Sequence, residues 1–298
     1  MPEKRIRIIA STVLLFMVLL GTPQQWVSAQ PMAIPPREEE ALAWLDNSPR
    51  WEEWARIRDG KEVLNAWMVF PERSDKAPIV IVLHEESGLT DWICAVADQL
   101  AAEGFIAIVP DLLSGKAPGG YGSFAVDTQT AASLVSSINM EEVNRRLDAV
   151  VQHAGSLKQR AVRSGIKPQN QVVPAPSGKI GVVGFGWGGS VAFQYAAVQS
   201  SLSAAVVYYG ASPSSAVLAN LQAPVLGLYA GNDTPVNATI PDAEAEMRRL
   251  GKHYEKEIYQ GADHGFLREQ SGAGPANERA SQQTWNRTVQ FLKQYLER

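Results

Sequence analysis

The feature that most constrains the fold is a run of five apolar residues at 79–83, Ile-Val-Ile-Val-Leu, which contains no polar position. A strand with one face in water alternates apolar and polar residues. A strand of a parallel sheet is covered by helices on both faces and forms a continuous apolar run. We therefore expect this strand to lie inside a sheet that has helices on both sides.

Strand and helix patterns alternate along the rest of the chain. We expect strands near residues 62–70, 79–84, 105–109, 179–184, 203–209, 224–229 and 254–259, and helices near residues 90–103, 138–163, 188–200, 239–251 and 277–296. This alternation predicts an α/β fold with a mostly parallel, doubly wound sheet flanked by helices. Ligands bind such sheets at the carboxyl ends of the strands, so we expect the site there.

The amino terminus has the pattern of a secretory signal peptide. Three basic residues within the first seven precede an apolar run at 8–20 and a small-residue cleavage site that ends at Ala29. The run is shorter than the roughly 20 residues that span a bilayer. We expect cleavage of residues 1–29 and export to the periplasm or the medium, with no membrane segment left after cleavage.

The remaining residues divide into an arm and one domain. Residues 30–60, rich in proline, acidic residues and tryptophan, are expected to form an N-terminal arm, and residues 61–298 a single α/β domain. Residues 1–29 hold three of the 27 basic and one of the 31 acidic residues, so the mature net charge is about -6. This charge argues against nucleic acid as a partner. The oligomeric state is left open.

Cysteine and histidine give no sign of a disulfide or a metal. Cys94 is the only cysteine, so it has no internal partner. The histidines at 84, 153, 253 and 264 include no pair with metal-site spacing on a helix. We therefore expect neither a metal nor a cofactor.

A glycine-rich stretch at 181–190, Gly-Val-Val-Gly-Phe-Gly-Trp-Gly-Gly-Ser, supports two interpretations. It matches the G-x-G-x-x-G pattern of a dinucleotide site, and it also matches a strand-to-helix elbow whose nucleophile is replaced by Gly186. A dinucleotide site needs an acidic residue about 20 residues later for the ribose. The sequence has no Asp or Glu between Asp148 and Asp233, which favours the elbow.

Two downstream residues complete the elbow interpretation. Asp233 follows the strand expected near 224–229, and His264 follows the strand expected near 254–259. The order elbow, acid, histidine is that of α/β-hydrolases, where the acid orients the histidine and the histidine transfers a proton. Both residues fall just beyond strand ends, where the fold predicts the site.

Four motifs together resemble the dienelactone hydrolase family. They are Ile-Val-Leu-His-Glu-Glu-Ser-Gly at 81–88, Gly-Phe through Val-Pro-Asp-Leu at 104–112, Gly-Phe-Gly-Trp-Gly-Gly at 184–189, and Gly-Ala-Asp-His-Gly-Phe at 261–266. The similarity runs across roughly residues 60–297. It implies an α/β-hydrolase that opens small lactones and esters with a Cys-His-Asp triad, helped by a glutamate.

The resemblance also implies a role for each matching position. Gly186 takes the place of the cysteine nucleophile, Asp233 and His264 complete the triad, and Glu85 is the glutamate. The oxyanion hole is implied to consist of the backbone amides of Trp187 and Glu86. The departure from the family is that position 186 has no side chain. Aromatic residues expected to line the pocket are Tyr121, Tyr208 and Phe266.

No other side chain is expected to replace the missing nucleophile. Ser190 lies one helical turn beyond Gly186, where its hydroxyl is expected to pack or to bond back to the helix. Cys94 falls within an expected helix, away from the strand ends.

Two functions therefore remain open. In the first, His264, oriented by Asp233, activates a water beside Gly186 and hydrolyses a small ester or lactone, with Glu85 as a second acid or base. In the second, the protein is an inactive relative that binds a small carboxylate or carbonyl ligand in the same pocket. The acid and the histidine favour the enzyme, and the missing nucleophile favours the binding protein.

Overall fold

A computed structural model of the protein describes residues 33–162 and 171–298. The expected signal peptide, residues 1–29, lies outside the described residues. Within the described ranges, no helix combines the length and the apolar character that crossing a bilayer requires.

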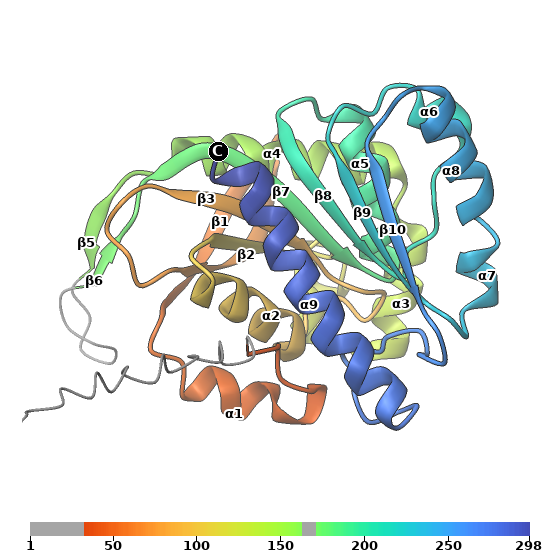
Figure 1. The fold of residues 1–298 in the computed structure, drawn as a ribbon. Coiled ribbons are helices and arrows are strands. Elements are labelled where there is room, and N and C mark those ends of the chain that lie inside the picture. Colours follow the sequence, from red (N-terminus) through yellow and green to blue (C-terminus); the bar gives the residue numbers. More distant parts are fainter. Residues whose placement is uncertain (1–32, 163–170) are drawn as a thin grey trace, which may run out of the picture. The chain divides into compact units, whose positions relative to one another are not determined.

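The described part of the chain alternates strands with helices (Figure 1). The strands are β1 (Trp51–Asp59), β2 (Glu62–Phe70), β3 (Ala77–Leu83), β4 (Ile106–Pro110), β5 (Arg160–Val162), β6 (Gln171–Val173), β7 (Pro176–Phe185), β8 (Leu202–Tyr208), β9 (Val225–Ala230) and β10 (Tyr254–Tyr259). The α-helices are α1 (Ala41–Asp46), α2 (Asp91–Ala102), α3 (Thr128–Ser137), α4 (Met140–Ser156), α5 (Trp187–Val198), α6 (Ser215–Leu218), α7 (Thr234–Asn237), α8 (Ile240–Arg249) and α9 (Pro275–Leu296). Short 3-10 helices are η1 (Glu38–Glu40), η2 (Pro118–Gly120) and η3 (Ser123–Ala125).

Eight strands form one sheet in the order β1, β2, β4, β3, β7, β8, β9, β10. The six strands from β4 to β10 in this order run parallel, and β1 and β2 extend one edge in antiparallel pairing. This arrangement confirms the predicted fold class, an α/β-hydrolase fold with a mostly parallel sheet. The carboxyl ends of the parallel strands meet at one edge.

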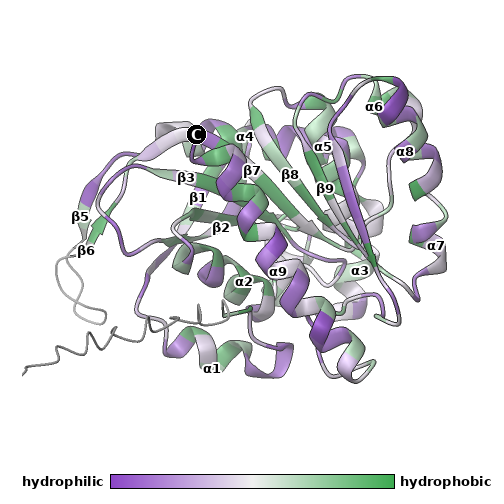
Figure 2. Ribbon diagram, in the orientation of Figure 1, coloured by the Kyte–Doolittle hydropathy of each residue, from purple (hydrophilic) through white to green (hydrophobic). Residues whose placement is uncertain are grey.

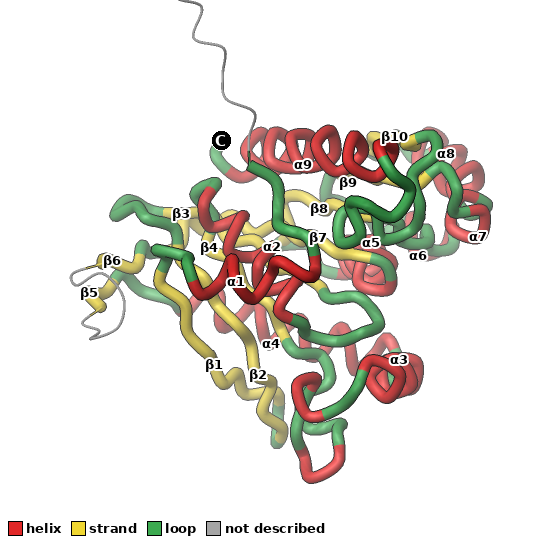
Figure 3. The backbone as a smooth tube through the Cα atoms, turned by 90° about the horizontal axis from the view of Figure 1, so that it is seen from below, coloured by secondary structure: helices red, strands yellow, loops and turns green. Residues whose placement is uncertain are grey.

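Helices cover both faces of the sheet. Helices α2 and α9 lie on one face, and α4 and α5 lie on the other, as the views in Figures 1 and 3 show. Every residue of β3 is buried, as its unbroken apolar run predicts. The hydropathy colouring in Figure 2 shows the same pattern, with hydrophobic central strands and a helix α9 that is hydrophilic on its outer side.

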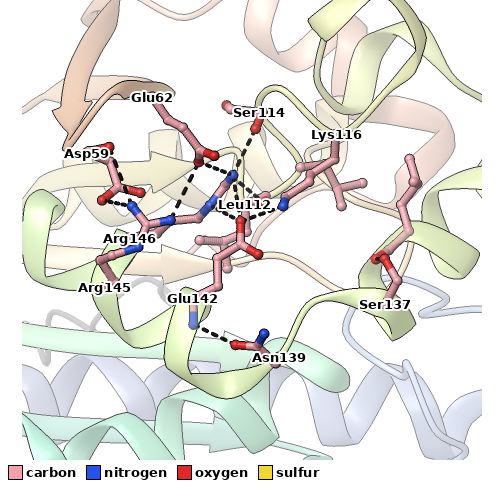
Figure 4. Close-up of polar contacts among 12 residues, drawn as sticks. Asp59, Glu62, Leu112, Ser114, Lys116, Ser137, Asn139, Glu142, Arg145 and Arg146 are labelled. Atoms are coloured by element: carbon pink, nitrogen blue, oxygen red, sulfur yellow. Dashed lines mark hydrogen bonds and ion pairs between the residues drawn. The ribbon is translucent and has the colours of Figure 1, made fainter.

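A buried arginine fastens α4 to the antiparallel edge of the sheet (Figure 4). Arg146 donates hydrogen bonds to the carbonyl oxygens of Leu112 at 3.0 Å and Ser114 at 2.9 Å. Its guanidinium also pairs with Glu62 at 3.0 Å and Glu142 at 2.9 Å. Because a buried guanidinium needs partners for its N–H groups, these contacts fix the loop that follows β4 at the carboxyl edge.

Three parts of the structure differ from the sequence-based expectation. Residues 51–59, expected in the N-terminal arm, form the edge strand β1. A helix at residues 128–137, α3, was not expected, and it begins where the Asp127 side chain accepts a hydrogen bond from the Thr130 amide. The helix expected at 138–163 ends at Ser156, and residues 160–162 form a short strand instead.

Candidate active site

Gly186 occupies a sharp bend between β7 and α5. Its backbone has φ 51° and ψ -117°, a region that residues with a side chain rarely adopt. Its amide donates a hydrogen bond to the carbonyl of Tyr208 on the neighbouring strand, at 3.1 Å. A side chain at this position would be strained, and glycine removes that strain.

The neighbouring glycines let helix α5 approach the sheet closely. A Cβ added at Gly188 would collide with the backbone carbonyls of Leu83 and His84, and one added at Gly189 would come within 2.6 Å of the Tyr208 carbonyl oxygen. The glycine pattern is therefore explained by close packing of helix against strand. It needs no nucleotide phosphate to account for it.

Asp233 and His264 form a hydrogen-bonded pair. Asp233 follows β9 and His264 follows β10, and His264 Nδ1 lies 2.6 Å from Asp233 Oδ2. The Asp233 side chain is buried, whereas 43% of the His264 side chain is exposed. The second carboxylate oxygen of Asp233 accepts a hydrogen bond from the Val236 amide at 3.4 Å. This arrangement fixes Nδ1 of His264 and leaves Nε2 without a hydrogen-bond partner in the described chain.

Hydrogen bonds between the loop after β9 and the loop after β10 hold Asp233 and His264 next to each other. The Asn232 side chain donates hydrogen bonds to Asp263 Oδ1 at 2.8 Å and to the Gly261 carbonyl at 3.1 Å. The ring of Tyr209 packs against the His264 ring with a centroid distance of 4.9 Å. The imidazole is therefore held on one side by a carboxylate and on another by an aromatic ring.

The space above Gly186 faces His264. A Cβ built on Gly186 would lie 3.4 Å from His264 Nε2, 3.4 Å from Glu86 Oε2 and 3.8 Å from Glu85 Cγ. The structure thus brings together Gly186, Asp233, His264 and Glu85, as the sequence analysis expects of a single site. It also places the Glu86 carboxylate beside position 186, which the sequence analysis did not anticipate.

Glu85 is a buried carboxyl group in an ion pair. Its Oε2 lies 2.8 Å from Nε of Arg268, a residue four positions after His264. Burial raises the pKa of Glu85 to about 7, against the opposing effect of the Arg268 charge. A carboxyl group with this pKa exchanges protons readily near neutral pH.

Two backbone amides at the site have no hydrogen-bond acceptor within the described chain. They belong to Trp187, the first residue of α5, and to Glu86 in the loop after β3. The first N–H groups of a helix have no intrahelical partner and carry partial positive charge. Both amides are therefore available to an oxygen that gains negative charge.

The expected pocket aromatics lie in two different places, since Tyr208 and Phe266 share one buried cluster. Tyr208 is fully buried and its hydroxyl contacts Thr288 of α9 at 2.7 Å, so its expected place in the pocket is wrong. Phe266 is also fully buried and packs beneath Tyr209 at 5.2 Å. Tyr121 is exposed and lines a hollow of about 410 Å³ with Trp54 and Phe124.

The aromatic residue that faces the site is Tyr209, one position after Tyr208. Tyr209 follows the last residue of β8, and its ring shares the neighbours Phe185 and Phe266 with Tyr208. Tyr209 has φ 37°, the only positive φ of a non-glycine residue in the described ranges, and this turns its ring toward His264. Burial raises the pKa of its hydroxyl well above the ordinary value.

The alternative nucleophiles are occupied or buried. The Ser190 hydroxyl accepts a hydrogen bond from the Ala211 amide at 2.8 Å and lies 3.4 Å from the Gly186 carbonyl oxygen. Cys94 is buried in α2, and burial raises the pKa of its thiol well above the ordinary value. Neither side chain is available to attack a ligand above Gly186.

A glycine bend that faces an aspartate-oriented histidine at the strand ends is the site layout of an α/β-hydrolase. The sequence model of the dienelactone hydrolase family matches residues 64–296, and the chain belongs to that family. A Saccharolobus solfataricus protein with the provisional name carboxymethylenebutenolidase is 28% identical over 251 residues, 79% of this chain and 95% of its own. The mouse carboxymethylenebutenolidase homolog is 29% identical over 206 residues, 67% of this chain and 75% of its own.

A solved structure agrees with this assignment. The crystal structure of a Klebsiella pneumoniae protein, provisionally described as a dienelactone hydrolase, superimposes with a TM-score of 0.68 at 27% sequence identity. The match covers 83% of this chain and 99% of the Klebsiella chain.

Proposed function

We propose that the protein hydrolyses a small carboxylic ester or lactone with a water molecule activated by His264. The observation that carries this proposal is the 3.4 Å distance between His264 Nε2 and a Cβ built on Gly186. The imidazole thus faces the position that a nucleophile would occupy in this fold. Membership of the dienelactone hydrolase family and the names of its relatives support the reaction type.

The proposed reaction uses the groups already described. Water bound above Gly186 gives a proton to His264 Nε2 while its oxygen attacks the substrate carbonyl carbon. The carbonyl oxygen becomes an oxyanion, which the amides of Trp187 and Glu86 stabilise. The C–O bond to the leaving oxygen then breaks, and His264 returns its proton to that oxygen. Asp233 stays ionised and stabilises the imidazolium.

Glu85 supplies a second proton-transfer group. With a pKa of about 7, a substantial fraction of Glu85 carries a proton at neutral pH. In this proposal the protonated carboxyl can donate to the leaving oxygen in place of His264; His264 then releases its proton to solvent, and the Glu85 carboxylate recovers one from solvent. Catalysis by such positioned acids contributes about 10²- to 10⁴-fold in rate.

A binding protein without turnover is the second candidate, because position 186 lacks an attacking atom. The surroundings restrict what such a protein binds. The carboxylate of Glu86 lies beside position 186, and Glu85 lies next to it. These groups repel a ligand carboxylate, so the ligand of a binding protein would be a neutral carbonyl compound.

Hydrolysis of a chromogenic ester by the mature protein tests the first candidate. We expect steady turnover without a burst, a loss of at least about 10²-fold in His264→Ala, and a faster first turnover with a burst in Gly186→Cys, which forms an acyl-enzyme. An inert parent with an active Gly186→Cys would refute hydrolysis by the parent and support the second candidate. Equal rates for the parent and His264→Ala, with Gly186→Cys inert, would refute the site itself.

Export is a separate proposal, supported by the signal-peptide pattern of residues 1–29. N-terminal sequencing of the protein expressed with its full sequence in a bacterial host tests it. We expect mature chains to begin at Gln30, and an intact amino terminus would contradict export.

A further inference from the structure

A hollow of about 410 Å³ lies at the edge of the sheet that β1 and β2 form (Figure 3). The rings of Trp54, Tyr121 and Phe124 line it, together with the side chains of Arg56 and Asn65. None of the residues assigned to the catalytic site lines this hollow. Its volume falls in the range of small-molecule binding sites.

The three aromatic side chains of the hollow are exposed. Trp54 is 48% exposed, Phe124 58% and Tyr121 66%. Single exposed apolar residues are common on protein surfaces, but several large rings that converge on one hollow mark a place where a ligand or a partner removes them from water. Trp54 lies on β1, whereas the other two rings belong to the loop after β4, so two segments distant in sequence form the hollow.

The rings of Trp54 and Phe124 form a corner. Their centroids lie 5.8 Å apart, and their planes meet at 82°. Trp54 is held in turn by edge-to-face packing on Trp67, with a centroid distance of 5.2 Å. Aromatic rings attract one another in offset-stacked and edge-to-face arrangements. A ligand ring in this corner packs face-on against one wall and edge-on against the other, which favours an aromatic ring over a saturated one.

An unpaired arginine lies beside the corner. Arg56 follows Trp54 by two positions on β1, so both side chains lie on the same face of the sheet, about 6.6 Å apart along the strand. The Arg56 guanidinium has no ion pair or hydrogen bond within the described chain. Asn65 lies opposite Arg56 in the strand register, and its side-chain amide is also without a partner there. Because guanidinium groups bind carboxylates through paired N–H···O bonds, Arg56 offers a partner to an anion in the hollow.

Hydrogen bonds fix the wall of the hollow that the loop after β4 forms. The Asp111 carboxylate accepts hydrogen bonds from the Leu113 amide at 3.1 Å, from the Ser123 amide at 2.9 Å and from the Ser123 hydroxyl. Asp111 is the only acidic residue among the described residues that line the hollow, and it is 3% exposed. Since these donors occupy both of its oxygens, Asp111 leaves Arg56 free. A site held in shape before binding loses little freedom when a ligand enters.

We propose that this hollow binds an aromatic carboxylate, with the ligand ring in the corner of Trp54 and Phe124 and the ligand carboxylate on Arg56. The spacing of Trp54 and Arg56 suits a ligand in which a short chain joins the ring to the carboxylate. The inference does not depend on the reaction proposed for His264, because the hollow shares no residue with that site.

The probe is 3-phenylpropionate, in which two methylene groups join the ring to the carboxylate. Ligand-observed NMR measures its dissociation constant with the mature protein, beside 3-cyclohexylpropionate, which lacks the aromatic ring, and 3-phenylpropanamide, which lacks the charge. We expect a Kd on the order of 1 mM for 3-phenylpropionate, and binding at least about 3-fold weaker for each analogue. Equal binding of the three compounds, or no binding of 3-phenylpropionate, would overturn the inference.

Substitutions locate the bound ligand. Arg56→Gln and Phe124→Ala should each weaken binding of 3-phenylpropionate by about 3- to 10-fold, and Arg56→Gln should also remove the preference over the amide. Arg279→Gln and Val198→Ala are matched controls, because Arg279 is exposed and Val198 is 57% exposed, and neither lines the hollow. Both controls should bind as the parent does. Parent-like binding by Arg56→Gln and Phe124→Ala would place the ligand elsewhere and overturn the inference.

Light scattering after size-exclusion chromatography tests the other possible occupant, a second copy of this chain. We expect the parent and Phe124→Ala to have the same mass at every protein concentration. A dimer of the parent that Phe124→Ala dissociates would show that the rings pack against a second copy, and would overturn the ligand site.

Discussion

Replacing Glu85 by glutamine removes a carboxyl group whose charged form is disfavoured by burial. The fold raises the pKa of Glu85 from 4.5 to about 7. The folded protein therefore holds this proton more tightly than the unfolded chain does. The stability that results is fully present below pH 4.5 and is lost as the pH rises to about 7. Each pH unit in this window is worth about 1.4 kcal/mol, so about 3 kcal/mol is lost in all.

Urea unfolding followed by tryptophan fluorescence at a series of pH values measures this loss. Glutamine does not titrate, so the free energy of unfolding of Glu85→Gln relative to the parent should rise by about 3 kcal/mol between pH 4.5 and pH 8. The comparison cancels the titration of groups that do not interact with Glu85. A constant offset from the altered contact with Arg268 does not change the slope.

Glu269→Gln is the matched control, because Glu269 pairs with the same arginine but its side chain is 54% exposed. An exposed ion pair contributes about 0–1 kcal/mol, so the difference in free energy of unfolding between this variant and the parent should stay within about 1 kcal/mol at every pH. If the Glu85→Gln difference were equally flat, the ion pair with Arg268 would offset the burial of the carboxyl, and the reasoning would be refuted.

Three further substitutions test packing by urea unfolding, one where α2 meets residues 44–50 and two at the glycine bend before α5. Asp98 is fully buried and accepts hydrogen bonds from Trp44 and Arg50 at 2.7 and 2.8 Å, so Asp98→Ala should lose about 3–5 kcal/mol of unfolding free energy, and a loss under about 1 kcal/mol would contradict this. Gly186→Ala meets only ordinary contacts but keeps φ 51°, so it should lose about 1–3 kcal/mol and still fold. Gly188→Ala collides with backbone and should fail to give folded protein by circular dichroism, and a cooperative unfolding transition near that of the parent would contradict the packing.

The central strands and the position of the site were predictable because their signals are local. A strand buried on both faces has to be apolar throughout, and residues 79–83 show this directly. Asp233 and His264 were found because each follows a strand, and parallel strands end at one edge. Their separation of 31 residues in sequence did not matter, since the fold class alone brings strand ends together.

Other features depend on contacts that the sequence does not show. Strand β1 contains five charged residues, and charges on an edge strand prevent pairing with further strands. The same charged composition is typical of an irregular segment, so the sequence analysis placed these residues in the arm. The choice between Tyr208 and Tyr209 depends on where the strand ends to within one residue. The contact between Glu38 and Arg268 joins residues 230 positions apart, and no local pattern signals it. Arg268 lies only four residues after His264, and this closeness in sequence was the one signal that it belongs to the site.

Positions 186 and 85 differ in the strain that the fold places on them. Glycine removes backbone strain on the order of 1–3 kcal/mol at the elbow, so the nucleophile position is relaxed. Burial of Glu85 imposes a cost of about 3 kcal/mol above neutral pH, so the proton-transfer part remains under electrostatic strain. Perturbed pKa values of this kind accompany sites that move protons. In the proposed function, the group that His264, Asp233 and Glu85 act on is therefore a water molecule above Gly186.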